Sequence, residues 1–511
     1  MTVSADNPYY SYNNTEWVAG VASPDVYDPV TKVKLNNMEG VAGIRKPSDF
    51  YFDGSGLLYV LDTSGQILVL NADLELQKTI TVKTQAGEDS PMNEPNGIFV
   101  GNGSIYVADG KNGRALKLDM NGENHEFAPS AMHHHADYIK MFESLIPEIC
   151  RREAPQTFYW PASPSSGGSY DDPNGENRGD VHYWDVWHGE KPFTEYRKFF
   201  FRYTSEFGFQ SFPCLKTVES FTLPEDRNIF SRVMERHQRN KSANGKILSY
   251  LSQTYRYPES FDNLLYASQL LQADAIRCGV EHWRRNRGRC MGAVIWQLND
   301  CWPVASWSSI DYFGRWKALH YAARRFFAPV MISCQEEGEV SQNPQINEFR
   351  TEPIRVSARL CVNETRETVG GLVRWALRTP DGAVVRQGEK TVVVPALSSR
   401  WLEEEAFPEA SVTEHYLSYA FVVEGEAVSR GAVLFCAPKH FAFRNPELRV
   451  SAQDGEITVE ASAFAKAVYV ESDDPDLLLS DNFFDMDPGI RKQQVLRGSA
   501  EGLRVRSVYD I

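Results

Sequence analysis

Hydrophobic and polar positions alternate in short runs over residues 1–127, and turn residues separate the runs. Phe50–Phe52, Leu57–Leu61 and Ile67–Leu70 are such runs, with Asp-Gly, Ser-Gly and Asn-Gly pairs around them. Alternation with a period of two between glycine turns is typical of antiparallel β-strands. The pattern therefore predicts an all-β segment at the start of the chain.

This segment contains an internal repeat. Residues 46–71 and 94–119 share the order Pro, turn, strand, Tyr-Val-x-Asp, Gly, strand, which resembles the blades of NHL-type β-propellers. A propeller ring needs about four to eight blades, and two are visible. The repeat predicts a propeller-like fragment with exposed sheet edges. Asp62 and Asp109 occupy matching positions and are predicted to hold turns rather than ligands.

The pattern changes near residue 128, where helical and strand-like runs begin to alternate. Helices are predicted over 133–153, 194–201, 258–287 and 315–327, and strands over 157–160, 181–184, 203–206 and 292–296. Alternating helices and strands indicate βα units in a parallel sheet or barrel.

From Val330 the pattern is all-β again, with strand-like runs spaced as in an immunoglobulin-like sandwich and a smaller β unit after residue 440. The predicted fold is multidomain α/β plus all-β. Its domains are a propeller-like fragment (1–127), the C-terminal half of a (β/α)8 TIM barrel (128–330), an Ig-like β-sandwich (331–440) and a C-terminal Ig-like β-domain (441–511).

Composition and charge argue against several classes of function. The 511 residues carry a net charge of −15 and no basic run, which argues against nucleic acid and anionic membranes as partners. No apolar stretch approaches the roughly 18 residues that span a bilayer, and no signal peptide is visible. The eight cysteines form no C-x-x-C pair, which favours reduced thiols and a cytoplasmic location. His133–His135 is interpreted as a solvated helix start rather than a metal site, and no cofactor is predicted.

Candidate chemistry lies at the predicted strand ends, where barrel enzymes carry their active sites. The strand ends offer Glu206, Asp180, Asp300 and His182 among several tryptophans. A carboxylate among tryptophans suits a glycosidase, because the carboxylate attacks the anomeric carbon while aromatic walls hold the sugar. On this pattern alone, a structural carboxylate in an ion pair is an equally good interpretation of Glu206.

Four ordered motifs then identify a resemblance. They are Thr157-Phe-Tyr-Trp-Pro-Ala-Ser-Pro-Ser, Gly179-Asp-Val-His-Tyr-Trp-Asp-Val-Trp-His-Gly, Thr204-Ser-Glu-Phe-Gly-Phe-Gln-Ser-Phe-Pro and Trp296-Gln-Leu-Asn-Asp-Cys-Trp-Pro-Val-Ala-Ser-Trp. With the tail Leu479-Ser-Asp-Asn-Phe-Phe-Asp, they resemble the β-mannosidase branch of glycoside hydrolase family 2 over about residues 131–511. The resemblance implies that Glu206 is the nucleophile of a retaining hydrolase. It also implies that the terminal mannose is held by His182, Trp184, Trp296, Asp300 and Trp302. Two alternatives remain. Trp296 and Trp302 could pack inside the barrel, and Asp300 could cap a turn.

The chain also departs from the family at one important point. The family's acid/base is the Glu of an Asn-Glu motif at the end of the fourth barrel strand, and here that upstream region is the propeller-like segment. Glu123 and Glu126 follow a turn of the second repeat, so no acid/base is found. The expected function is an exo-acting β-mannosidase-type hydrolase that removes terminal β-D-mannose from oligosaccharides, impaired in this chain. The alternatives are a non-catalytic propeller fusion that binds a partner, or a gene-model chimera. Open sheet edges predict self-association.

Overall fold

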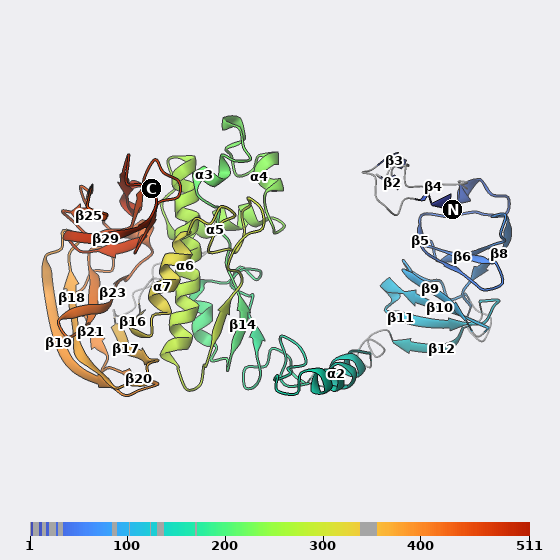
Figure 1. Ribbon diagram of the computed structural model, residues 1–511, viewed down its shortest axis with the longest axis horizontal. Helices are drawn as coiled ribbons and strands as arrows, with labels where there is room; N and C mark the ends of the chain where they lie inside the picture. Colours follow the sequence, from blue (N-terminus) through green and yellow to red (C-terminus); the bar gives the residue numbers. More distant parts are fainter. Residues whose placement is uncertain are drawn as a thin grey trace. The chain divides into compact units, whose positions relative to one another are not determined.

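The computed structural model describes most of the chain. Its described residues are 2–3, 10–12, 17–19, 27–28, 34–83, 89–101, 103–122, 124–129, 137–168, 171–337 and 355–511. They divide into two compact units, Met1–Tyr159 and Trp160–Ile511 (Figure 1). His133–His135 and Glu123 lie outside the described residues.

The first unit contains two four-stranded antiparallel sheets, one for each copy of the repeat. The first sheet is β5 (Pro47–Phe52), β6 (Leu58–Asp62), β7 (Gln66–Leu70) and β8 (Leu76–Thr81). The second is β9 (Gly97–Gly101), β10 (Ser104–Asp109), β11 (Arg114–Leu118) and β12 (Asn124–Pro129). Both sheets bury apolar side chains in one shared core. Two short pairs precede them: β1 (Thr2–Val3) with β4 (Tyr27–Asp28), and β2 (Tyr10–Tyr12) with β3 (Trp17–Ala19). The propeller interpretation of the two large sheets stays a prediction.

The repeated aspartates hold turns in both sheets, as predicted. Asp62 is fully buried, and its Oδ1 accepts from the backbone N–H groups of Arg45 at 3.0 Å and Ser64 at 2.7 Å. Asp109 is equally buried and accepts from the backbone N–H of Asn93 at 2.7 Å. Backbone donors in loops need such acceptors when water is excluded.

The segment between the sheets and the second unit is helical. It comprises the π-helical turn η3 (Lys140–Leu145) and α2 (Ile146–Glu153). The strand predicted over Thr157–Trp160 is wrong, because these residues form no strand. An apolar run becomes a strand only when a neighbouring strand accepts its hydrogen bonds, and β13 (Val181–His182) pairs with β14 (Thr204–Phe207) instead.

The second unit begins with a small parallel sheet in the order β13, β14, β15 (Ala293–Ile295). The 25-residue helix α6 (Phe261–Arg285) connects β14 to β15 and packs against α7 (Ala318–Phe326). The turn η4 (Phe193–Lys198) lies between β13 and β14. Four short helices precede α6 in the connection from β14 to β15: α3 (Leu215–Val218), η5 (Pro224–Asp226), α4 (Arg232–Arg236) and α5 (Ala243–Thr254). One apolar core joins these helices to the sheet. Parallel strands with helical crossovers match the predicted βα pattern, and closure of half a barrel stays a prediction.

Residues from Val330 onward form an Ig-like sandwich, as the sequence predicts. One sheet pairs β16 (Val330–Glu337), β17 (Arg355–Asn363), β20 (Ser398–Trp401) and β21 (Glu405–Ala406). The other has the order β19 (Val384–Val394), β18 (Val369–Arg378), β22 (Tyr416–Val423) and β23 (Glu426–Leu434). Alternate residues of both sheets face one apolar core. The 3₁₀ turn η6 (Pro438–His440) leads out of the sandwich.

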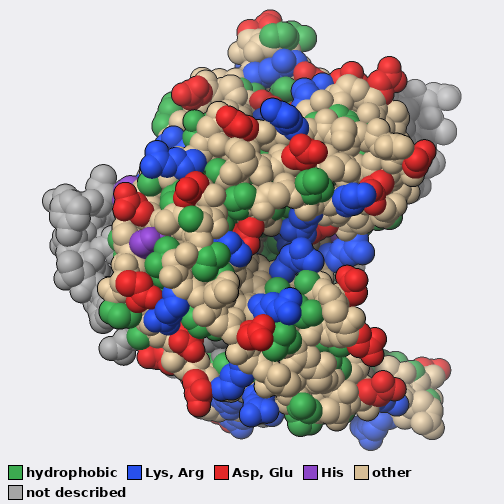
Figure 2. All heavy atoms as spheres, turned by 90° about the vertical axis from the view of Figure 1, so that its left-hand side faces the viewer, with side chains coloured by type: hydrophobic (Ala, Val, Ile, Leu, Met, Phe, Trp, Pro, Cys, Tyr) green, Lys and Arg blue, Asp and Glu red, His purple; other side chains and the backbone are tan. Residues whose placement is uncertain are grey.

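The C-terminal domain is a second, smaller β structure. One sheet has the order β24 (Arg449–Gln453), β25 (Glu456–Ala461), β29 (Gly489–Arg497) and β27 (Leu478–Leu479). The other has the order β28 (Phe484–Met486), β26 (Ala465–Glu471) and β30 (Arg504–Arg506), and the chain closes on η7 (Val508–Asp510). Figure 2 shows a hollow on this side of the second unit, with Lys and Arg side chains gathered around it.

Candidate active site

Glu206 stands on the central strand of the parallel sheet, one residue before its end. It is paired in register with His182 of β13. The Trp184 indole Nε1–H donates to Glu206 Oε1 at 3.0 Å, and His182 Nδ1 lies 3.5 Å from Oε2. Both carboxylate oxygens are thus contacted by side chains from the preceding strand end, while the side chain keeps 24% of its exposure. The carboxylate is therefore oriented and still reachable from solvent.

A second carboxylate, Asp180, organises the groups around His182. Its Oδ2 accepts from the hydroxyls of Ser163 at 2.7 Å and Ser205 at 2.5 Å. Its Oδ1 accepts from the Trp160 indole at 3.0 Å and the Ser165 backbone N–H at 2.9 Å. Burial alone would raise the pKa of Asp180, but these hydrogen bonds outweigh it and lower that pKa.

Ser163 connects the two carboxylate centres. Its hydroxyl oxygen lies 2.7 Å from Asp180 Oδ2, to which it donates, and 2.9 Å from Nε2 of His182. The chain Asp180–Ser163–His182 therefore sets the orientation of the ring that lies against Glu206. Sequence reasoning quoted the Ser163-Pro-Ser motif without a role for its hydroxyls. The serines of two of the quoted motifs, Ser163 and Ser205, were the signal that was available.

Gly208 permits the tryptophans to approach the carboxylate. A Cβ atom on Gly208 would lie 2.3 Å from the carbonyl oxygen of Trp296 and 3.0 Å from ring atoms of Trp184 and Trp307. Contacts that short do not occur, so only glycine fits two residues after Glu206. The glycine of the Ser-Glu-Phe-Gly motif thus brings the end of β15 against the end of β14.

Two aromatic side chains near this edge remain partly exposed. Trp296 follows β15, donates its backbone N–H to Phe207 at 2.8 Å, and is 45% exposed. Trp160, which is bound to Asp180, is 39% exposed. Indole faces that remain open to solvent beside a carboxylate are suited to stacking on the apolar C–H faces of a sugar ring.

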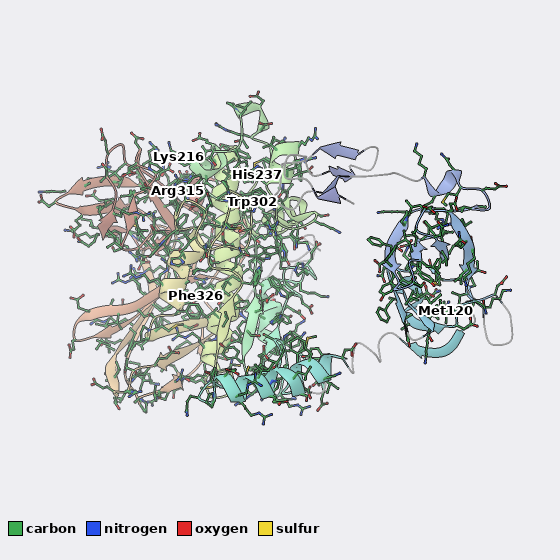
Figure 3. All side chains as sticks on the ribbon, turned by 45° about the vertical axis from the view of Figure 1, so that its right-hand side comes forward. Met120, Lys216, His237, Trp302, Arg315 and Phe326 are labelled. Atoms are coloured by element: carbon green, nitrogen blue, oxygen red, sulfur yellow. The ribbon has the colours of Figure 1, made fainter. Side chains whose placement is uncertain are left out.

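The other two predicted site residues have different surroundings. Asp300 is buried, and its oxygens accept from the hydroxyls of Ser306 and Ser308, both at 2.6 Å. Trp302 packs on His237, with ring centroids 4.9 Å apart, and Figure 3 labels the two residues side by side. The structure thus brings Glu206, His182 and Trp184 into direct contact, with Trp296 on the adjoining strand end. The contacts described for Asp300 and Trp302 are with other groups.

Among the described residues, the side-chain polar partners of Glu206 are Trp184 and His182, and neither is a carboxylate. Asp180 is unsuited to act as a general acid, because a general acid needs a pKa near or above the working pH and that of Asp180 is lowered. Glu126 lies on β12 of the first unit. Within the described residues the site therefore offers one positioned carboxylate, Glu206, without a second carboxylate suited to act as its acid.

Two family models match the C-terminal part of the chain. Residues 360–440 match the Mannosidase Ig/CBM-like domain family, and residues 443–511 match an Ig-fold domain family of mannosidases. These matches make the chain similar to β-mannosidases, as the sequence motifs predict, and the parallel sheet that carries Glu206 precedes both matched domains.

Particular relatives can be named. Beta-mannosidase B of Aspergillus terreus is 29% identical over 428 residues, which are 78% of this chain and 48% of that protein. Beta-mannosidase B of Aspergillus clavatus is 30% identical over 392 residues, or 72% of this chain and 44% of that protein. The crystal structure of β-D-mannosidase from Dictyoglomus thermophilum superposes with a TM-score of 0.63 and 27% identity, covering 72% of this chain and 44% of that one. The chain thus spans about half the length of the curated relatives it matches. In the described residues no helix is long and apolar enough to cross a membrane.

Proposed function

We propose that the second unit carries the nucleophile side of a retaining exo-β-mannosidase site, with Glu206 as the nucleophile. The observation that carries the proposal is the placement of Glu206 at a parallel-strand end, where Trp184 and His182 orient both of its oxygens. The similarity to β-mannosidases supports mannose as the sugar. The substrate class is an oligosaccharide with a terminal β-D-mannose, and Trp296 supplies a stacking face.

The first chemical step follows from this placement. A carboxylate oxygen of Glu206 forms a bond to the anomeric carbon while the bond to the glycosidic oxygen breaks and its electron pair leaves with the aglycone. An alcohol leaving group needs a proton at that moment, and a positioned acid contributes roughly 10²–10⁴-fold. An aryl oxide is stable without the proton. The chain is therefore proposed to be impaired on natural mannosides and to retain a weak reaction with activated ones.

The second step requires a water molecule to attack the mannosyl–enzyme ester, and this attack needs a base. Azide is an anion and needs none. It attacks the anomeric carbon from the face opposite the ester, releases the Glu206 carboxylate, and yields a β-mannosyl azide. Azide should therefore accelerate turnover only if a covalent ester on Glu206 limits the rate.

The test uses the full chain with 4-nitrophenyl β-mannoside and with β-1,4-mannobiose. We expect weak release of nitrophenol that azide accelerates, formation of β-mannosyl azide, and hydrolysis of mannobiose near background. Glu206→Ala should abolish the reaction with the aryl substrate, whereas Glu190→Ala, at an exposed residue outside the site, should not. Brisk turnover of mannobiose that azide leaves unchanged would mean that an acid/base is in place. No reaction with either substrate would favour a non-catalytic binding protein.

A further inference from the structure

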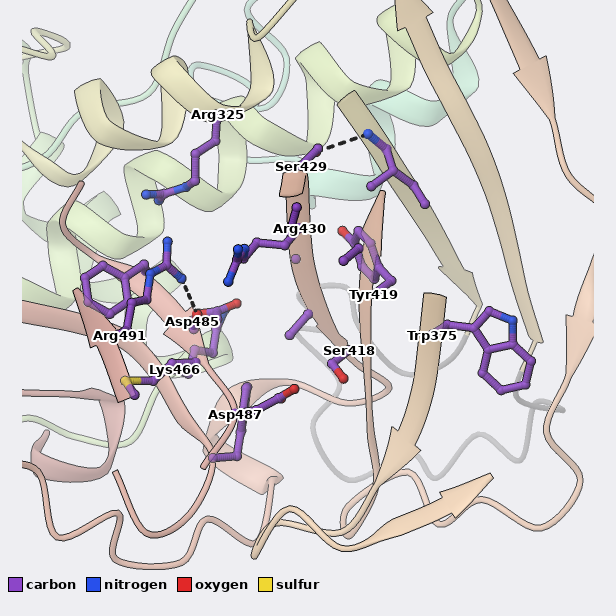
Figure 4. Close-up of a pocket in the computed structure, with 18 of the residues that line it drawn as sticks. Arg325, Trp375, Ser418, Tyr419, Ser429, Arg430, Lys466, Asp485, Asp487 and Arg491 are labelled. Atoms are coloured by element: carbon purple, nitrogen blue, oxygen red, sulfur yellow. Dashed lines mark hydrogen bonds and ion pairs between the residues drawn. The ribbon is translucent and has the colours of Figure 1, made fainter. Parts of the chain in front are cut away.

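A cavity of about 890 Å³ lies within the second unit, away from the parallel-strand ends. Helices α6 and α7 form one wall, strands β18, β22 and β23 of the sandwich form another, and the C-terminal domain closes it. Its size is within the range of small-molecule sites, roughly 300–1,000 Å³. Figure 2 shows its mouth as the hollow described above, and Figure 4 shows the lining in detail.

The charge of this lining is opposite in sign to that of the whole chain. The chain carries a net charge of −15. The cavity is lined by seven basic and five acidic side chains. The basic ones are Arg277, Arg325, Arg374, Arg378, Arg430, Lys466 and Arg491, and the acidic ones are Asp274, Glu281, Glu389, Asp485 and Asp487. A basic surplus in a concave site of an acidic protein attracts anions, because low-dielectric walls concentrate its field.

Three arginines from three different elements point toward one another at one end of the cavity (Figure 4). They are Arg325 of α7, Arg430 of β23 and Arg491 of β29. One carboxylate, Asp481, serves two of them: it contacts Arg325, and it pairs with Arg491 at 2.8 Å. Backbone carbonyls accept further hydrogen bonds: those of Asn482 and Phe483 from Arg325, both at 3.0 Å, and that of Asp485 from Arg491 at 2.9 Å. Within the described part of the chain, Arg430 has no acceptor for its guanidinium.

The three positive charges therefore exceed their local compensation. Burial lowers the pKa of Arg491 to about 10, and the charges of Arg325 and Arg430 contribute to this lowering, while Asp481 and Asp485 oppose it. Like charges in a partly desolvated site repel strongly, and an anion placed between them removes that repulsion. Guanidinium groups are suited to this because their planar forks donate two hydrogen bonds to an oxyanion.

Hydroxyl groups extend the donor set along the cavity wall. Ser429 Oγ accepts from the Ile332 backbone N–H at 3.1 Å, and Ser418 Oγ accepts from Arg378 Nε at 3.0 Å. Each hydroxyl oxygen is thus used as an acceptor, which leaves its O–H free to donate. Donors that outnumber acceptors suit a ligand that carries several oxygen acceptors.

We propose that this cavity binds a phosphate group at Arg325, Arg430 and Arg491, carried by a small molecule such as a phosphorylated sugar. A tetrahedral dianion presents enough oxygen acceptors for three guanidinium forks. The volume of the cavity leaves room for an organic part beside the phosphate. The site shares no residue with the Glu206 centre, so its existence does not depend on the proposed glycosidase chemistry.

The experiment measures the melting temperature of the full chain against ligand concentration at constant ionic strength adjusted with NaCl. The ligands are inorganic phosphate, mannose 6-phosphate and mannose. A ligand that binds the folded state raises the melting temperature in a saturable way. We expect both phosphates to do so and mannose not to. A lower dissociation constant for mannose 6-phosphate than for inorganic phosphate would identify the ligand class as a sugar phosphate. Equal dissociation constants would identify the ligand as free phosphate.

Two variants locate the binding. Arg430→Gln should weaken phosphate binding at least tenfold. Without ligand it should melt no lower than the wild type, because it relieves repulsion. The matched control is Arg366→Gln, which makes the same charge change at an exposed position of the same sandwich outside the cavity, and should change binding less than twofold. Absence of a saturable phosphate effect, equal weakening in both variants, or an equal effect of mannose would overturn the proposal.

Discussion

Asp180 offers the sharpest test of how the candidate site is held. The side chain is 7% exposed and accepts four hydrogen bonds, which come from two serine hydroxyls, one indole and one backbone amide. Asp180→Ala removes all four acceptors at once. The Ser165 amide is buried and would lose its partner, whereas Ser163 and Trp160 are exposed enough to regain water.

The cost can be worked out from these contacts. A buried donor left without an acceptor costs about 2 kcal/mol, and each partly exposed hydrogen bond contributes about 1 kcal/mol. Contributions within one network do not add fully, so we expect a loss of about 3–5 kcal/mol in the free energy of unfolding. For a cooperative segment of this size, the melting temperature should fall by roughly 6–12 °C.

The assay is thermal unfolding followed by tryptophan fluorescence, because Trp160 and Trp184 report on this edge of the sheet. The control is Asp185→Ala, an exposed aspartate of the same motif. It should change the melting temperature by no more than about 2 °C. If Asp180→Ala melts within that same margin of the wild type, the network does not contribute as argued and the reasoning is refuted.

Acid titration provides an independent check on the same residue. The pKa of Asp180 is lower in the folded than in the unfolded state, so its ionisation stabilises the fold above the ordinary aspartate pKa. That contribution is lost as the pH falls through the folded pKa. The difference in melting temperature between wild type and Asp180→Ala should therefore be constant near neutral pH and should shrink below about pH 4. A difference that grows on acidification would contradict the assignment.

Three further predictions concern other parts of the second unit. Gly208→Ala should lower the free energy of unfolding by about 1–3 kcal/mol, because the added Cβ overpacks against Trp184 and Trp296, and it should alter the near-ultraviolet circular dichroism. The control Gly245→Ala in α5 adds its Cβ to open space and should not destabilise the fold. Burial, and to a smaller extent Arg285, lower the pKa of His282 to about 4. The free energy of unfolding should therefore fall by about 3 kcal/mol as the pH is lowered from 6.5 to 4, and His282→Gln should lack this decline. The open edge at β15, with exposed Val294, should cause concentration-dependent association in light scattering; a monodisperse monomer that binds no hydrophobic dye would argue against it.

The sequence by itself determined the order of the structural classes along the chain. Hydrophobic periodicity placed α6 within three residues of its observed bounds, because its buried side chains recur at helical spacing. Short strand-like runs placed β14 and β15 within one residue of their observed bounds. The repeat located the two sheets of the first unit, and the strand-end motifs singled out Glu206, His182 and Trp184.

Tertiary structure decided which of these residues meet. The sequence pattern of Thr157–Trp160 predicts a strand, but these residues form none, because strand formation depends on a hydrogen-bonding neighbour that the local sequence does not specify. The link from Asp180 through Ser163 to His182 joins residues up to 19 positions apart. The three arginines of the cavity come from one helix and two strands, with Arg325 and Arg491 lying 491 − 325 = 166 positions apart. Periodicity reports which face of an element is buried, whereas side-chain partners are set by how separate elements pack against one another.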